Sequence, residues 1–280
     1  MNSLIKSFYW GKRTYIMGIL NVTPDSFSDG GDFHTLETAL IQAKKMVEAG
    51  ADLIDIGGQS TRPGSEFISI EEELNRVLPI IKLLRSQENI CREIPISVDT
   101  TRAIVAEKAV EVGANLINDI SAGTYDNEMF SVVADLKVPI ILMHIRGTPK
   151  TMQKLTDYQN LIGEIYQFLN SRIEEAIKAG ITREKIIIDP GIGFAKNYEQ
   201  NLEIIRNLSR FKSLNCPILV GLSRKSFIGK ILNQPDAKQR VWGTAAGCVA
   251  AIAQSVDILR VHDVKEMSEV CQVADVIFRS

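Results

Sequence analysis

The sequence has no excess of charge of either sign, few aromatic residues and few cysteines. Its 280 residues carry 32 Lys+Arg against 34 Asp+Glu, a formal net charge of −2, and only 6% are aromatic. A protein that binds nucleic acid by counterion release is normally basic overall, so we expect no nucleic-acid partner. With 45% hydrophobic residues, the chain is too apolar for an intrinsically disordered protein.

The cysteines and the first 20 residues exclude further classes. There is no C-x-x-C pair and no histidine at metal-ligand spacing around Cys91, Cys216, Cys248 and Cys271. This argues against a zinc site and against a disulfide framework. Lys6, Lys12 and Arg13 interrupt the apolar residues at the N-terminus, so it forms neither a signal-peptide core nor a membrane span. We therefore expect a cytoplasmic protein with reduced thiols and no membrane partner.

Short runs rich in Ile, Leu and Val recur along the chain. They cover residues 14–20, 52–56, 94–98, 114–117, 138–143, 185–188, 217–221 and 256–261. Most lack strict alternation, as expected for parallel strands covered by helices on both faces. The length allows one large domain or two small ones. Because no Pro/Gly/Ser-rich linker interrupts the pattern, the sequence predicts one α/β domain over residues 1–280, a closed (β/α)8 TIM barrel; an open doubly wound sheet is the alternative.

Helical patterns separate these runs. The clearest cover residues 35–50, 69–84, 161–180 and 267–277. Thr35 is the predicted N-cap of the first helix, and Ser69-x-x-Glu72 is a capping box that opens the second. Pro79, inside the second pattern, indicates a kink or the end of that helix.

Polar side chains gather where the predicted strands end. The segments concerned are residues 21–25, 55–64, 98–100, 118–119, 143–147, 189–194, 223–226 and 260–263. A single Asp or Asn there is about as often a turn residue or a helix N-cap. Eight consecutive polar strand ends are poorly explained in that way, and in a barrel they converge on one mouth, where the active sites of such folds lie.

The side chains of this mouth form two chemical groups. Hydrogen-bond donors and cations that suit phosphate or diphosphate are Arg62, Lys225, Arg260 and His262. Acceptors that suit a flat heterocycle with several N–H groups, such as a pteridine or guanine, are Asp99, Asn118 and Asp189. Asn21 offers a neutral oxygen to a Mg²⁺ ion that keeps waters and substrate phosphates. The sequence contains no GxSxG motif and no Cys–His pair, so it gives no indication of covalent catalysis.

Eight longer motifs follow one another along nearly the whole chain. They are NVTPDSFSDGG (21–31), DIGGQSTRPGS (55–65), SVDTT (97–101), INDISAG (117–123), MHIRGTPKTMQ (143–153), DPGIGF (189–194), GLSRKSFIG (221–229) and RVHD (260–263). In this order they resemble the motifs of the dihydropteroate synthase family. The resemblance implies a (β/α)8 barrel, usually a homodimer, that condenses 6-hydroxymethyl-7,8-dihydropterin diphosphate with p-aminobenzoate in folate biosynthesis.

The resemblance also implies roles for individual residues. Pterin contacts are expected from Asp99, Asn118, Asp189 and Lys225, with Met143, Phe194 and Gly221 close by. Diphosphate contacts are expected from Asn21, Arg260 and His262; these three and Lys225 form the catalytic set, and Asn21 is also the Mg²⁺ ligand. Loops 22–33 and 58–66 are expected to close over the site. The p-aminobenzoate side, which is also the target of sulfonamides, is expected to include Phe27, Asp29, Thr61, Arg62, Pro63 and Ser226.

Two positions depart from the family pattern. Gln59 stands where the family commonly has Glu, and residues 195–197 read Ala-Lys-Asn where Gly-Lys-Thr/Ser is frequent. Neither position belongs to the expected pterin or anion residues. We therefore expect altered loop details rather than lost activity.

The expected chemistry and its competitors follow from the same residues. The amine of p-aminobenzoate is a weak nucleophile, so we expect early, SN1-like loss of diphosphate. A pterin-binding methyltransferase is similar in its pterin contacts but does not need the STRPG, SRKS and RVHD segments. A non-catalytic pterin- or phosphate-binding barrel and a Schiff-base aldolase that uses Lys225 also compete with the synthase hypothesis.

Overall fold

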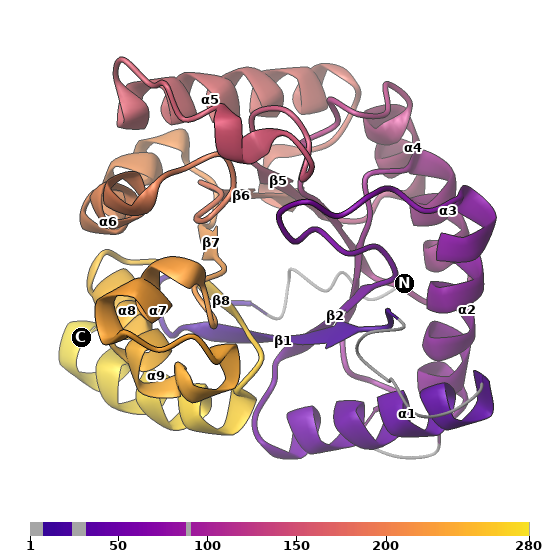
Figure 1. Ribbon diagram of the computed structural model, residues 1–280. Helices are drawn as coiled ribbons and strands as arrows, with labels where there is room; N and C mark the ends of the chain where they lie inside the picture. The colour runs from indigo at the N-terminus through magenta and orange to yellow at the C-terminus, as the bar shows by residue number, and fades with distance from the viewer. Residues whose placement is uncertain (1–7, 24–31, 88–90, 280) are drawn as a thin grey trace.

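Within the described residues, eight parallel strands alternate with helices, and the helices surround the strands (Figure 1). The computed structural model describes residues 8–23, 32–87 and 91–279. The strands are β1 (Tyr15–Asn21), β2 (Leu53–Gly57), β3 (Ile96–Asp99), β4 (Leu116–Asp119), β5 (Ile140–Met143), β6 (Ile186–Asp189), β7 (Leu219–Val220) and β8 (Ile258–Val261). The helices are α1 (Asp32–Glu48), α2 (Ile70–Ser86), α3 (Ala103–Glu111), α4 (Met129–Leu136), α5 (Leu161–Lys178), α6 (Tyr198–Arg206), α7 (Ser226–Leu232), α8 (Val241–Ala253) and α9 (Val264–Phe278). All eight predicted strands are confirmed.

The strands close into a barrel. Hydrogen-bonded neighbours follow the order β6-β5-β4-β3-β2-β1-β8-β7. The first and last strands of this order, β6 and β7, are joined by a bridge in which Ile188 of β6 pairs in parallel with Ile218, the residue before β7. The amide of Ile188 donates to the carbonyl of Pro217 at 2.9 Å. The predicted (β/α)8 barrel is thus confirmed, and the open sheet is not what the chain forms.

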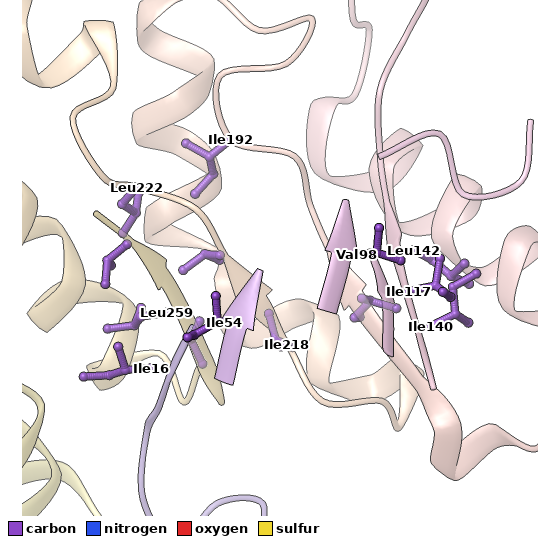
Figure 2. Packing of buried hydrophobic residues seen from close by; sticks show 14 of the residues in the cluster. Ile16, Ile54, Val98, Ile117, Ile140, Leu142, Ile192, Ile218, Leu222 and Leu259 are labelled. Atoms are coloured by element: carbon purple, nitrogen blue, oxygen red, sulfur yellow. The ribbon is translucent and has the colours of Figure 1, made fainter. Parts of the chain in front are cut away.

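Alternate residues of each strand face either the helices or the barrel interior. Ile54, Ile117 and Leu259 belong to a large apolar cluster between strands and helices (Figure 2). A separate cluster fills the interior and consists of Tyr15, Met17, Leu53, Leu116, Ile141, Ile187, Leu219 and Ile258. Burial of each such large side chain contributes roughly 1.5–3 kcal/mol. Because both faces are buried, the strands appear in the sequence as continuous apolar runs.

Aromatic side chains close the N-terminal end of the barrel. Phe8 and Trp10 pack against the interior cluster, with ring centroids 4.4 and 5.5 Å from that of Tyr15. The amide of Tyr9 donates to the Tyr15 hydroxyl at 2.6 Å. This plug leaves the carboxyl ends of the strands as the open mouth.

The helices correct two expectations. Helix α1 begins at Asp32 and not after Thr35. Helix α2 begins as predicted, with the Ser69 hydroxyl accepting from the amide of Glu72 at 3.1 Å, but it continues through Pro79 to Ser86. Pro79 is exposed, and on the solvent side of a helix a missing backbone donor is tolerated most easily.

Among the described helices, none is long and apolar enough to cross a membrane.

Candidate active site

The polar residues of the mouth stand one layer above the apolar interior. In β2, Asp55 follows the interior residue Leu53 by two positions, and in β8 Arg260 follows Ile258 in the same way. Side chains alternate along a strand, so a residue two positions further on faces the same interior. The same relation to an interior residue holds for Asn118, Met143, Asp189 and Gly221. The strand pattern therefore explains why these side chains meet.

Four neighbouring strands place a row of residues at the same height. Asn21 pairs in register with Gly57, Gly57 with Asp99, and Asp99 with Asn118. A Cβ on Gly57 would lie 3.5 Å from the Cβ of Asp99 and 3.6 Å from Oδ1 of Asn21. The glycine thus leaves room between the predicted Mg²⁺ ligand and a predicted pterin residue.

Arg260 is held by two carboxylates. Its Nε donates to Oδ2 of Asp55 at 2.6 Å, and its Nη2 donates to Oδ2 of Asp99 at 2.8 Å. The Nδ2 of Asn118 donates to the same Asp55 oxygen at 3.0 Å. We expected Arg260 on the diphosphate side and Asp99 on the pterin side, whereas here they form an ion pair. No role was expected for Asp55, although its position two residues after Leu53 marks it as facing the mouth.

Burial dominates the electrostatics of this cluster. It raises the pKa of Asp99 to about 7, although the Arg260 charge lowers it. The carboxylates of Asp55, Glu73 and Asp119 raise the pKa of Asp99 further. Burial and the neighbouring carboxylates thus disfavour the charged form of Asp99, and the ion pair with Arg260 favours it.

Asp189 and Lys225 form the opposite side of the mouth. Burial raises the pKa of Asp189 to about 6, opposed by the amide of Gly191, which donates to Oδ1 at 2.7 Å, and by the Lys225 charge. Burial lowers the pKa of Lys225 to about 8, opposed by Asp189. The Lys225 Nζ lies 4.4 Å from the centre of the Phe194 ring, a cation–π contact. Three predicted pterin residues thus interact with one another.

An apolar wall borders these charges. Met143 is buried with Ile120, Ile145, Met152 and Ala195, and Phe194 packs against this cluster. Gly221 offers space instead, since a Cβ placed on it would meet nothing within 4 Å. A flat ring could therefore pack against Met143 and Phe194 without contacting a side chain at Gly221.

His262 contacts Ser223, and its burial disfavours the charged imidazolium form. Its backbone amide donates to the Ser223 hydroxyl at 3.1 Å, and Nδ1 of its ring lies 3.0 Å from the same oxygen. Burial lowers the pKa of His262 to about 3, and the charges of Arg224, Arg260 and Lys225 lower it further. Ser223, which contacts both the backbone and the ring of His262, was not among the expected site residues.

A second buried pair, Lys196 and His144, joins the segments that follow β6 and β5. The Nζ of Lys196 lies 2.8 Å from Nδ1 of His144 and 3.3 Å from its carbonyl oxygen. Gly191 adopts φ 73°, and a Cβ there would lie 1.9 Å from the His144 carbonyl oxygen, so only glycine fits. Ala195 also has a positive φ of 51°, which suits the glycine that is frequent in the family. The difference from the family pattern at Ala195 can be seen in the sequence. No sequence signal reveals the contact between Lys196 and His144.

The residues expected on the p-aminobenzoate side lie at the rim. Arg62, Pro63 and Ser226 are exposed and Thr61 is half-buried. Loop 58–69 is tied to the loop after β5, where the amide of Gly64 donates to the carbonyl of Pro149 at 3.0 Å. Phe27 and Asp29, together with most of loop 22–33, lie outside the described residues.

The side-chain oxygen of Asn21 is the candidate protein ligand for a metal ion. Its side chain is half-buried at the end of β1 and makes no hydrogen bond to any residue that the structure describes. In the same described part of the chain, no group of three or more His, Cys, Asp or Glu side chains could hold a metal ion. A single amide oxygen fits a Mg²⁺ ion that keeps several waters and binds mainly through substrate phosphates.

Comparisons with known proteins agree with this geometry. The family model described as pterin binding enzyme matches residues 17–262. A dihydropteroate synthase of Synechocystis sp. is 59% identical over 272 residues, which cover 97% of this chain and 93% of that protein. The Clostridium difficile dihydropteroate synthase crystallised with pteroic acid is 46% identical and superimposes with a TM-score of 0.91 over 98% of this chain and 100% of that one.

A third relative was crystallised with 4-aminobenzoic acid. The Xanthomonas albilineans dihydropteroate synthase with 4-aminobenzoic acid is 40% identical, with a TM-score of 0.88 over 95% of this chain and 94% of that one. The family match covers most of the chain, and the likeness in sequence and fold extends over nearly all of it. The chain belongs to the dihydropteroate synthase family of pterin-binding enzymes.

Proposed function

We propose that the mouth of this barrel condenses 6-hydroxymethyl-7,8-dihydropterin diphosphate with p-aminobenzoate and releases diphosphate and 7,8-dihydropteroate, a step of folate biosynthesis. The chain is a transferase. The observation that carries the proposal is that opposite chemistries meet in one mouth. The buried acceptors Asp99, Asn118 and Asp189 lie beside the cations Arg260 and Lys225.

The acceptors suit the amino-pyrimidinone edge of the pterin. Asp99, Asn118 and Asp189 are only 6%, 4% and 6% exposed. A carboxylate that accepts two parallel N–H groups is a strong bidentate partner, and low local polarity strengthens it further. Because Asn118 gives an N–H to Asp55, its carbonyl oxygen remains as an acceptor for the ligand. Met143 and Phe194 supply the apolar contact for the ring.

The donors suit the leaving group. Early cleavage of the C–O bond places negative charge on diphosphate and positive charge on the methylene conjugated to the pterin. Arg260, Lys225 and the imidazole of His262 would stabilise the first, and Asp99 and Asp189 the second. Preorganised groups of this kind contribute roughly 3–4 kcal/mol each to the transition state. No general base is required, because an aniline nitrogen is largely unprotonated at neutral pH.

We propose Mg²⁺ as the cofactor, with Asn21 as its protein ligand. Its amide oxygen, which accepts no hydrogen bond from the described residues, and its place beside Gly57 and Asp99 support this assignment. When bound, the ion supplies positive charge at the leaving diphosphate.

Product formation tests the function directly. The purified protein is incubated with both substrates and Mg²⁺, and dihydropteroate and diphosphate are quantified. We expect both products in equal amounts, and none after chelation with EDTA until Mg²⁺ is restored. Pterin binding without product would instead identify a non-catalytic pterin-binding barrel.

The rim residues support a p-aminobenzoate site. Thr61, Arg62 and Pro63 belong to a loop that is tied down by hydrogen bonds at both ends, and Ser226 opens α7 beside Lys225. A cationic Arg62 suits the carboxylate of p-aminobenzoate. Sulfonamides are expected to compete at this site, which a displacement assay with p-aminobenzoate would show.

We propose a homodimer that uses the outer faces of α8 and α9. These helices pack on each other and expose Trp242 by 77%, Val276 by 82% and Ile277 by 65%. Exposed large apolar side chains on a folded chain are typical of a protein interface, and a two-fold dimer can cover them with its own copy. Sedimentation analysis would show a dimer for the parent and a monomer for Val276→Asp.

We also propose that the protein works in the cytoplasm. Cys216, Cys248 and Cys271 are buried free thiols, which suits a reducing compartment. Fractionation of cells that produce the protein, followed by immunodetection, tests the location.

A further inference from the structure

Asp55 makes both of its described hydrogen bonds to residues that are expected to bind substrate. Its Oδ2 accepts from Nε of Arg260 at 2.6 Å and from Nδ2 of Asn118 at 3.0 Å. Its side chain is 0% exposed, so it lies below the layer that a ligand could reach. We propose that Asp55 is a positioning residue, which acts on the reaction by fixing the orientation of Arg260 and Asn118.

The donor count of Arg260 shows what this fixation achieves. A guanidinium has five N–H groups in one plane. Asp55 takes the Nε–H and Asp99 takes one N–H of Nη2. Two attachment points prevent rotation about the Cδ–Nε bond, and three N–H groups remain in a fixed plane for an anionic leaving group.

Asp55 is the more permanent of the two anchors. Asp99 is 6% exposed and is itself expected to accept N–H groups of the pterin, which would compete with its bond to Arg260. Asp55 cannot be engaged in this way, because it is fully buried. Arg260 therefore stays oriented by Asp55 while Asp99 turns to the substrate.

The same oxygen fixes the amide of Asn118. Since Nδ2 donates to Asp55, the amide cannot flip without placing two oxygens against each other. The acceptor Oδ1 is thus kept for the ligand. Asp55 in this way links the pterin side of the mouth, through Asn118, to the diphosphate side, through Arg260.

Two substitutions separate charge from geometry. In Asp55→Asn the amide oxygen can accept both hydrogen bonds, and the new NH2 takes the place of Oδ1, which has no partner among the described residues. Asp55→Ala removes both bonds. The inference rests on the proposed function, and we expect kcat to fall by about 100-fold in Asp55→Ala and by about 10-fold in Asp55→Asn. KM for p-aminobenzoate stays unchanged in both, because its site is not contacted.

A buried aspartate at the other end of the barrel provides the control. Asp257 is 8% exposed, precedes β8 and accepts from the amides of Ile218 and Gly11. Asp257→Asn should lower the melting temperature without changing kcat or either KM. A kcat loss in Asp257→Asn equal to that in Asp55→Asn would reduce the role of Asp55 to general stability.

A double variant decides whether Asp55 acts through Arg260. If it does, Asp55→Ala/Arg260→Ala loses no more kcat than Arg260→Ala alone, because the positioned group is already absent. Multiplicative losses, or an unchanged kcat in Asp55→Ala, would overturn the proposal. Titration of 6-hydroxymethylpterin and of inorganic diphosphate into each variant gives a readout without turnover. Both ligands should bind more weakly to Asp55→Ala than to the parent. Because this measurement needs no turnover, it tests the positioning role even if the parent shows no synthase activity.

Discussion

Nη2 of Arg260 lies 2.8 Å from Oδ2 of Asp99, and this ion pair joins the two halves of the mouth. Arg260 comes from β8 and is expected to face the leaving diphosphate, whereas Asp99 ends β3 and is expected to accept from the pterin. A ligand that engages Asp99 therefore acts directly on the environment of Arg260. Binding of the ring and stabilisation of the leaving group are coupled through one contact.

Loss of the Arg260 charge is the first prediction. Arg260→Ala should lower kcat by about 100-fold, because charge on the departing diphosphate loses one preorganised partner. Pre-steady-state quenching would measure the chemical step alone. A variant with the parent's kcat would remove Arg260 from the anion site.

Asp189 offers a test of pterin recognition. Asp189→Asn keeps an oxygen that can accept from Gly191 but loses the charge that a bidentate N–H edge requires. We expect pterin affinity to fall by about 100-fold or more while the melting temperature changes by only a few degrees, since a buried charge is also removed. Calorimetric titration and thermal scanning measure the two quantities, and parent-like pterin affinity would contradict the assignment.

The pH dependence of pterin binding follows from the raised pKa of the same residue. Asp189 is ionised above its pKa of about 6 and protonated below it. Because a protonated carboxyl accepts N–H groups poorly, pterin affinity should decrease as pH falls through about 6, by up to tenfold for each pH unit below it. Asp189→Asn should bind weakly, with this part of the pH dependence absent. An affinity that is constant from pH 7 to pH 5 would show that the ionised form is not required.

Much of the site could be predicted because the barrel imposes a simple rule. A polar residue two positions after an interior residue of a strand faces the mouth, as Asp189 does after Ile187. The apolar runs reveal the strands, and the strand ends reveal these residues. The rule applies equally to Asp55, for which no role was expected.

Pairing inside the mouth could not be predicted from the sequence. Arg260 and Asp55 are 205 residues apart, and their contact depends on barrel closure and side-chain length. The lowered pKa of His262 depends on its burial and on the nearby charges of Arg224, Arg260, Lys225 and Arg62, which spacing does not reveal. Likewise, Pro79 suggested the end of a helix that in fact continues, because this residue lies on the exposed side.

The Gln59 departure leads to a prediction on the loop that carries Thr61 and Arg62. Nε2 of Gln59 donates to the carbonyls of Ser60 and Glu66, both at 2.8 Å, while Oε1 accepts from the amide of Ile68 at 2.8 Å. One amide thus ties both ends of the loop, and a carboxylate could keep only the bond to Ile68. In Gln59→Glu, two donated bonds are lost and a negative charge faces two carbonyl oxygens.

We therefore expect Gln59→Glu to raise KM for p-aminobenzoate by about tenfold, since each lost bond is worth roughly 1 kcal/mol. KM for the pterin diphosphate should stay the same, because within the described residues Asp99, Asn118 and Asp189 make no side-chain hydrogen bond to this loop. Hydrogen exchange of peptides that cover residues 60–68 should become faster. Gln167→Glu, on the exposed face of α5, makes the same charge change far from the loop and serves as the control. If exchange and both KM values match those of Gln167→Glu, the amide of Gln59 does not hold the loop.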